Sequence, residues 1–176
     1  MATANDKLQD ESIAHAIWIA RYSTSVANRM IKILNDSDAE LTARLLVAMD
    51  SLDADSFTVS RLEALLASVR ALNREAVQSM YAGLSDELQQ LAQHEAGFQL
   101  SLFHFAIPDD VLSLHPLVGI SPDAVYAAAM AQPFQGRLLS EWADNLESDR
   151  MARISNTVRQ GFLLGDTHEQ IARKVR

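Results

Sequence analysis

Apolar side chains recur in alternating steps of three and four along the first part of the chain. Such steps place residues on one face of an α-helix, so the pattern predicts a helix over residues 10–34. Residues 35–38 are expected to break or bend it, because Asn, Asp and Ser side chains compete for backbone hydrogen bonds. A shorter helix should follow, as far as Met49. The stripe of the first helix consists of Ile13, Ile17, Ala20, Thr24, Ala27, Ile31 and Leu34.

A second long apolar pattern follows a polar linker over residues 50–57. Ser60 and Glu63 have the spacing of a capping box, which predicts the start of a helix. Gly83 is expected to cap or interrupt this helix. The next helix carries Leu and Phe residues at heptad spacing and should end before Pro108. Glu95 falls in that apolar seam, where it is expected to pair with an arginine or to mark a place that opens to water.

The last third of the chain combines an irregular stretch with further helices. Residues 108–120 hold two prolines and a glycine among apolar side chains, which predicts an irregular connector. Ser121 followed by Pro122 predicts a short helix. A long helix is expected over residues 137–164, and a short terminal helix should follow from a capping box. The predicted fold is all-α, an elongated antiparallel helical bundle with a long C-terminal helix and a short terminal helix.

The pattern divides the chain into three expected parts. Residues 1–107 should form a helical bundle and residues 108–120 the irregular connector. Residues 121–176 should form a C-terminal helical segment that leads towards a domain absent here. The composition agrees with helices, since only 6 Gly and 4 Pro occur, while 48% of residues are apolar and can build a core. No stretch approaches the roughly 20 apolar residues of a membrane span, so no membrane partner is expected.

Charge is unevenly distributed along the chain. The net charge is −8; residues 150–176 hold six cationic and two acidic side chains, which makes that segment +4 and leaves −12 on residues 1–149. An acidic body repels phosphate, so weak or no direct binding to DNA is expected. Arg173, Lys174 and Arg176 remain candidates for contact with DNA or an acidic partner, although a solvated helix end is the simpler interpretation.

No pattern of catalytic or metal-binding residues stands out. None of the five histidines has a second ligand at a recognised spacing, and the absence of cysteine excludes thiolate sites and disulfides. Asp109 and Asp110 are adjacent carboxylates, and a helix N-terminus or a loop charge explains them better than acid–base chemistry. The sequence therefore predicts no enzyme, no cofactor and no metal site.

Six apolar residues are candidates for binding a partner. The connector is apolar yet irregular, so it either folds onto the protein's own core or is buried by a partner. Phe134 is expected to extend the same surface. Trp142 lies on an apolar row of the long C-terminal helix, where it belongs either to the core or to an interface. The candidates are Leu112, Leu114, Leu117, Val118, Phe134 and Trp142.

The C-terminal third also resembles a known family. Residues 133–142 read PFQGRLLSEW and run into the long helix, and residues 153–175 read RISNTVRQGFLLGDTHEQIARKV. This is similar to phage minor head, or head morphogenesis, proteins related to the Mu F protein. In that family a helix ends in a Gly-containing segment, and a turn leads to a short helix with Ile and Val at fixed places. Gly161, Gly165, Ile171 and Val175 take those places here.

The resemblance implies a structural virion component in the N-terminal portion of such a protein. It implies a place at the portal vertex or the capsid interior, reached from the host cytoplasm during assembly. It also implies a role in head assembly or genome delivery, with the portal protein, the major capsid protein or a second copy as partners. In the family this helix leads into a further C-terminal domain, whereas here Arg176 is the last residue. The alternative is a non-viral helical adaptor or oligomerisation module.

Overall fold

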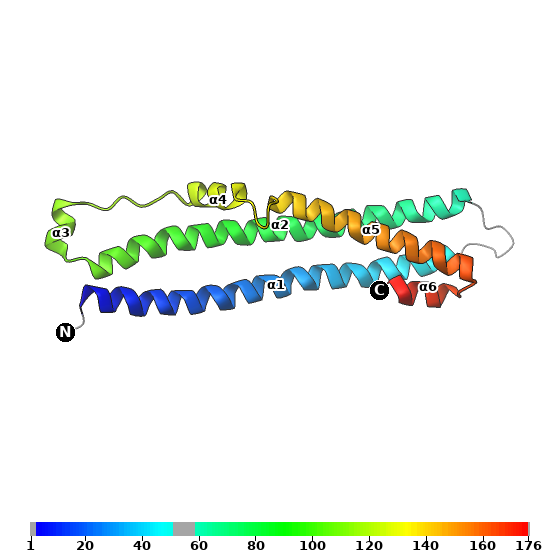
Figure 1. Cartoon of the computed structure of the whole chain (residues 1–176), viewed down its shortest axis with the longest axis horizontal. Coiled ribbons are helices and arrows are strands. Elements are labelled where there is room, and N and C mark those ends of the chain that lie inside the picture. The colour runs from blue at the N-terminus through cyan, green and yellow to red at the C-terminus, as the bar shows by residue number, and fades with distance from the viewer. Residues whose placement is uncertain (1–2, 51–58, 176) are drawn as a thin grey trace. The chain divides into compact units, whose positions relative to one another are not determined.

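The computed structural model describes residues 3–50 and 59–175. Helices make up 88% of it, and no strand occurs within these two ranges, which confirms the all-α prediction. No helix among the described residues is both long and apolar enough to cross a bilayer. In chain order the helices are α1 Ala4–Asp50, α2 Val59–Ala106, α3 Asp109–Leu114, α4 Pro122–Ala131, α5 Leu139–Leu164 and α6 His168–Val175 (Figure 1).

Helix α1 continues through the four polar residues that were expected to break it. The prediction of a break at residues 35–38 is therefore wrong. Two of these side chains have partners other than the local backbone. Lys32 Nζ lies 2.6 Å from Asp36 Oδ2, and Arg150 of α5 donates to Asp38. The two carboxylates are engaged in these ion pairs. They therefore do not compete for the backbone hydrogen bonds of the helix.

Helix α2 is likewise uninterrupted at Gly83, where a cap or break was predicted. A glycine inside a helix costs only about 1 kcal/mol relative to alanine, so packing of the flanking turns can override it. The polar linker expected over residues 50–57 lies outside the described residues from 51 onwards.

Part of the connector is helical, contrary to the expectation of an irregular segment. Asp109 and Asp110 occupy the first turn of α3, where negative charge is favourable beside the positive end of the helix dipole. The backbone N–H groups of Val111 and Leu112 both donate to the carbonyl oxygen of Pro108, at 3.0 and 3.1 Å. The irregular part is thus confined to residues 115–121, between α3 and α4.

The predicted starts of the last two short helices are confirmed. Helix α4 has Ser121 at its N-cap and Pro122 in its first turn, although the serine side chain makes no capping hydrogen bond. Before α6, the Thr167 N–H donates to Gln170 Oε1 at 2.8 Å. The Gln170 N–H donates in return to Thr167 Oγ1 at 3.3 Å. These two bonds form the reciprocal capping box that the sequence predicted.

The backbone contacts divide the chain into two units that do not follow chain order. Unit 1 comprises Met1–Arg29 and Gly83–Leu138, and unit 2 comprises Met30–Ala82 and Leu139–Arg176. Each unit therefore takes one part of α1 and one part of α2. Unit 1 adds α3 and α4, whereas unit 2 adds α5 and α6.

Unit 2 contains the larger apolar core. Its α1 segment contributes leucines and a methionine, α2 contributes leucines and a valine, and α5 and α6 close the cluster from the other side. In α5, Ile154 and Val158 are buried, as their place on the predicted apolar row requires. The core consists of Leu41, Leu45, Met49, Leu65, Leu66, Val69, Met151, Ile154, Val158, Ile171, Ala172 and Val175.

Unit 1 buries fewer large apolar side chains. Among the described residues of unit 1, the buried apolar ones are Val26, Ala92, Leu102 and Ala106, two of which are alanines. Between α1 and α2 lies a ring cluster, made of His15, Trp18, Tyr22, His94 and Phe98. In unit 1 stacked rings therefore pack between the two helices, whereas in unit 2 leucine side chains do so.

Candidate partner-binding surface

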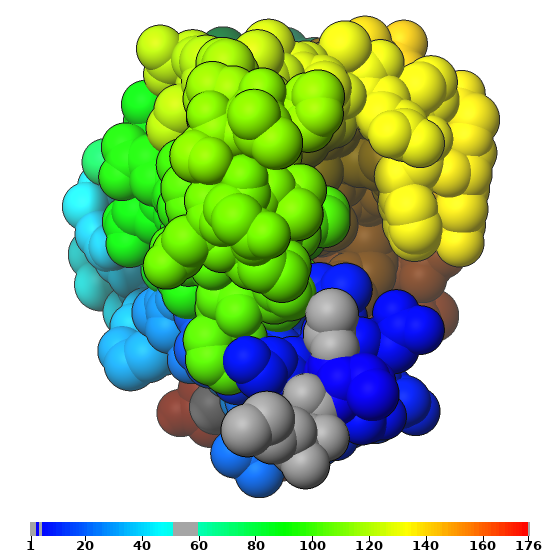
Figure 2. Space-filling view, turned by 90° about the vertical axis from the view of Figure 1, so that its left-hand side faces the viewer, coloured from blue at the N-terminus to red at the C-terminus, as the bar shows by residue number. Residues whose placement is uncertain are grey.

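The connector presents apolar side chains to solvent. Val111 and Leu114 of α3 are 43% and 77% exposed, and Val118 and Ile120 of the following irregular segment are 91% and 69% exposed. We call these four residues the connector surface. In the space-filling view of Figure 2, α3 and the residues after it occupy much of the face towards the viewer, beside α4 in yellow.

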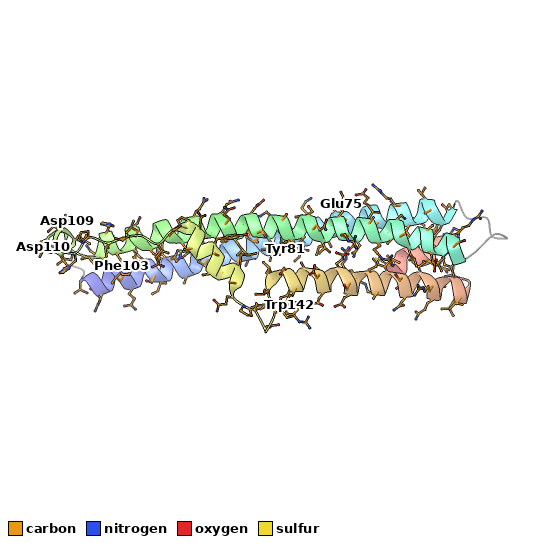
Figure 3. All side chains as sticks on the ribbon, turned by 90° about the horizontal axis from the view of Figure 1, so that it is seen from above. Glu75, Tyr81, Phe103, Asp109, Asp110 and Trp142 are labelled. Carbon is orange, nitrogen blue, oxygen red and sulfur yellow. The ribbon has the colours of Figure 1, made fainter. Side chains whose placement is uncertain are left out.

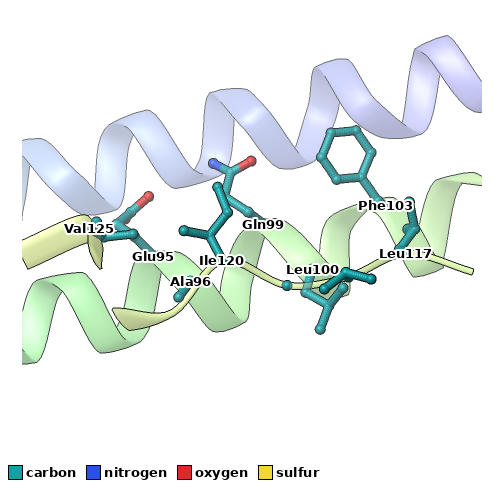
Figure 4. A pocket seen from close by; sticks show the side chains of 10 residues that line it. Glu95, Ala96, Gln99, Leu100, Phe103, Leu117, Ile120 and Val125 are labelled. Atoms are coloured by element: carbon teal, nitrogen blue, oxygen red, sulfur yellow. The ribbon is translucent and has the colours of Figure 1, made fainter. Parts of the chain in front are cut away.

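An apolar groove lies beside the connector surface. Its volume is about 420 Å³, and residues of α2 form one wall while the connector and the first turns of α4 form the other (Figure 4). Gly119 brings the chain close to α2, since a Cβ at this position would lie 3.4 Å from Leu100 Cδ2. The lining residues are Glu95, Ala96, Gln99, Leu100, Phe103, Leu117, Val118, Gly119, Ile120 and Val125.

The connector residues predicted to bind a partner do not all behave alike. Leu112 and Leu117 are half-buried, and Leu117 lines the groove. Leu114 and Val118 are exposed, so they do not belong to the protein's own core. Some side chains of the segment thus pack on α2, and others point to solvent. Burial of the exposed side chains by a partner stays a prediction.

Phe134 stands at the start of a tight turn in unit 1. Its N–H donates to the Arg137 carbonyl at 2.8 Å, and the Arg137 N–H donates back at 3.2 Å. The two residues between them, Gln135 and Gly136, have φ angles of +49° and +79°. Two consecutive positive φ values are the mark of a type I′ turn, and Gly136 meets that requirement without strain. The Phe134 side chain is 67% exposed.

Trp142 lies on α5 and is half-buried (Figure 3). It belongs to unit 2, whereas the connector surface and Phe134 belong to unit 1. On the predicted apolar row of α5, Ile154 and Val158 are fully within the core, and Phe162 packs against it. The C-terminal part of this apolar row therefore belongs to the unit 2 core.

Two cations of the basic C-terminal segment form ion pairs within the chain, one of them buried and the other at the surface. Arg150 is buried in its ion pair with Asp38, and Lys174 Nζ lies 2.5 Å from Asp166 Oδ2. Arg173 is exposed on α6, and Arg176 lies outside the described residues. Fewer cations than the six counted in the sequence are therefore available to a phosphate backbone.

A hydrogen-bonded carboxylate closes one end of the ring cluster. The Tyr22 hydroxyl donates to Glu87 Oε2 at 2.7 Å, and Arg29 Nη2 lies 2.6 Å from Glu87 Oε1. Burial, together with the nearby carboxylate, raises the pKa of Tyr22 to about 12. The hydrogen bond from Tyr22, and then the Arg29 guanidinium, hold the pKa of Glu87 below its usual value of 4.5.

The structure also brings together three residues that the sequence did not connect. His15 of α1 faces His94 and Glu95 of α2, and His15 Nε2 lies 2.8 Å from Glu95 Oε1. Glu95 was expected to pair with an arginine or to mark an opening to water; the side chain nearest its carboxylate is that of His15, and Glu95 also lines the groove. No spacing rule could have found this set, because its members lie on different helices. The one signal was a carboxylate inside an apolar seam.

Comparison with family models, with curated proteins and with solved structures finds no match for this chain.

Proposed function

We propose that this chain is a minor head protein of a phage, a structural virion component that acts by binding proteins rather than by catalysis. Its partners are the portal protein, the major capsid protein or both, at the portal vertex or on the capsid interior. Its role is in head assembly or genome delivery. The observation that carries the proposal is the connector surface, where Leu114 and Val118 are 77% and 91% exposed.

Exposure of this kind favours a protein partner. Single exposed apolar residues are ordinary, but here four lie within ten residues of one segment, beside an apolar groove. Covering a fully exposed Leu or Val side chain contributes about 1.5–3 kcal/mol by the hydrophobic effect. Connectors held on a helical scaffold are also where binding residues commonly lie.

The resemblance of residues 133–175 to minor head proteins is the second support. The local structure gives that motif a physical reason: a Cβ at Gly161 would lie 2.4 Å from Ile171 Cγ1, so the glycine permits α6 to pack on α5. Gly165 has a φ of +72° in the turn between them. Ile171 and Val175 are both buried in the unit 2 core.

A paired substitution tests the proposal in assembled particles. Leu114→Ser with Val118→Ser removes apolar area from the connector surface without touching the unit 2 core. We expect unchanged helicity and an unchanged melting temperature, with incorporation into particles reduced at least about fivefold, which corresponds to about 1 kcal/mol of lost contact. The matched control is Leu163→Ser with Leu164→Ser on α5, since these leucines are 86% and 75% exposed and belong to unit 2, whereas the connector belongs to unit 1.

Copy number in purified particles, measured by quantitative mass spectrometry, decides the outcome. Normal incorporation of a folded connector variant would refute the connector as the docking surface. Absence of the wild-type chain from particles would refute the phage assignment itself. Neighbouring genes for a portal protein and a terminase would support it independently.

A helical adaptor or oligomerisation module is the second candidate. One observation favours it: Ile13 and Ile17, one turn apart on α1, are 52% and 50% exposed. Apolar residues at this spacing form part of a helix–helix seam. Self-association that is lost in the Ile13→Ser, Ile17→Ser variant, in a chain that particles do not contain, would favour this candidate over the first.

A further inference from the structure

We propose that His15, His94 and Glu95 form a binding site for one divalent transition-metal ion of the Zn²⁺ type. The three residues come from two helices of unit 1, with His15 on α1 and the other two on α2. One ligand atom from each lies within 4.8 Å of the other two. The proposal revises the expectation from the sequence that no metal site exists.

The donor set suits this class of ion. Imidazole nitrogen and carboxylate oxygen bind Zn²⁺ at about 2.0–2.2 Å, and two histidines with a glutamate form a known three-ligand arrangement with one open position. A tetrahedral ion with such bonds places its ligand atoms about 3.4 Å apart. His94 is exposed, so its side chain has room to make the small movement that shortens the widest separation.

Each imidazole ring stacks on an aromatic neighbour. His15 lies against Phe98 with ring centroids 3.8 Å apart, and His94 lies against Trp18 with centroids 4.0 Å apart. The two pairs of rings are close to parallel, with interplanar angles of 12° and 23°. A stacked imidazole uses its faces for the aromatic contact and keeps its edge nitrogens for a ligand. Ligand orientation fixed by neighbouring groups strengthens metal binding.

Glu95 supplies the second observation. Its Oε1 atom is buried and accepts no hydrogen bond of acceptable geometry from the described residues, although His15 Nε2 lies 2.8 Å away. Among the same residues, Glu95 pairs with no lysine or arginine. A buried carboxylate oxygen whose nearest partner is a poorly aligned imidazole is uncommon, and a cation bound by both groups is one of the arrangements that account for it.

The site also has a structural consequence for unit 1. A metal bound by His15 and by the α2 pair would link α1 to α2 where the apolar core is small. Because an ion that binds only the folded state raises the stability of that state, the melting temperature should rise with metal concentration. The stabilisation should disappear when a chelator removes the ion.

Titration of the full chain with ZnCl₂ and CoCl₂, after treatment with EDTA, tests the proposal. We expect one ion per chain by calorimetry, visible absorption from four-coordinate Co²⁺, and a rise in melting temperature that EDTA reverses. Glu95→Gln keeps the shape of the side chain and His15→Phe keeps the stack on Phe98, so both variants should fold. Each should lower Zn²⁺ affinity at least about tenfold, with folding checked by circular dichroism.

His104→Ala is the matched control, because His104 is an exposed histidine of the same helix. It should bind Zn²⁺ as the wild-type chain does. Wild-type affinity in folded Glu95→Gln and His15→Phe would overturn the proposal, as would the absence of binding to the wild-type chain. Equal losses in His104→Ala and in the site variants would also overturn it, since they would indicate diffuse binding by surface histidines.

Discussion

Gly161 lies so close to Ile171 that a Cβ atom on the glycine would stand 2.4 Å from the isoleucine Cγ1 and 2.9 Å from its Cδ1. The contact joins α5 to α6 in the unit 2 core, where Ile171 is fully buried. Real Cβ atoms do not approach so closely, so a larger residue at position 161 must push α6 outward or force Ile171 out of its rotamer.

Gly161→Ala is therefore expected to destabilise the protein by about 1–3 kcal/mol through overpacking. The control is Gly97→Ala in α2, where an added Cβ meets nothing within 4 Å. There the same substitution should stabilise by roughly 0.5–1 kcal/mol, because alanine favours helix. Urea denaturation followed by circular dichroism measures both. Equal effects of the same sign would show that the α5–α6 contact is looser than described.

The Tyr22–Glu87 pair should make stability depend on acid. The pKa of Glu87 in the folded chain lies below its ordinary value of 4.5. The ionised carboxylate therefore stabilises the folded chain at pH values above 4.5. The contribution is lost as the pH falls through the folded pKa. Tyr22→Phe removes the main hydrogen-bond donor, so the pKa of Glu87 should rise and acid unfolding should begin at higher pH.

At pH 7 the same Tyr22→Phe substitution should cost roughly 1.5–3 kcal/mol, the usual net value of one hydrogen bond to a charged group. Tyr81→Phe serves as the control, because the half-buried Tyr81 makes no hydrogen bond to the described residues through its hydroxyl. Thermal melts from pH 3 to 7 distinguish the two variants. Parallel pH profiles for wild type and Tyr22→Phe would contradict the assignment.

Asp38 and Arg150 should show a large coupling energy in the stability of the folded chain. The Arg150 side chain is 9% exposed and that of Asp38 is 25% exposed, so loss of either partner leaves a poorly solvated charge. Arg150→Met is expected to cost roughly 3 kcal/mol, and Arg150→Met with Asp38→Leu should recover most of it. The exposed Glu40–Arg44 pair of α1 is the control, with a coupling below about 0.5 kcal/mol. A double-mutant cycle gives both values, and similar couplings would refute the distinction.

Binding to duplex DNA should be weak and only mildly dependent on salt. Neutralising six phosphates would give a slope of about −5 in log affinity against log salt. Arg150 is buried in an ion pair with Asp38, the exposed Lys174 pairs with Asp166, and the rest of the chain is strongly acidic, so a shallower slope is expected. Fluorescence anisotropy from 50 to 200 mM salt measures it. Tight binding at physiological salt would show that the basic segment is a DNA contact after all.

Features set by neighbouring residues could be predicted from the sequence, and features set by distant partners could not. The capping box of Thr167 and Gln170 depends on three residues of spacing and was correctly placed. The break predicted near Asp38 failed because Arg150, far along the chain, engages that carboxylate. The meeting of His15 with Glu95 depends on how two helices align, which no local pattern encodes.

Unit 2 is built from helices that are synthesised at different times. Asp38 and Arg150 are 112 residues apart, and Asp50 contacts His168 across 118 residues. At translation rates of 5–20 residues per second, roughly 6–24 s pass between the making of the first helix and the arrival of the helices that cover it. Throughout that interval the nascent chain holds Leu41 and Leu45 without their α5 and α6 neighbours. The protein should therefore depend on a chaperone at the ribosome more than a helical chain of local contacts would.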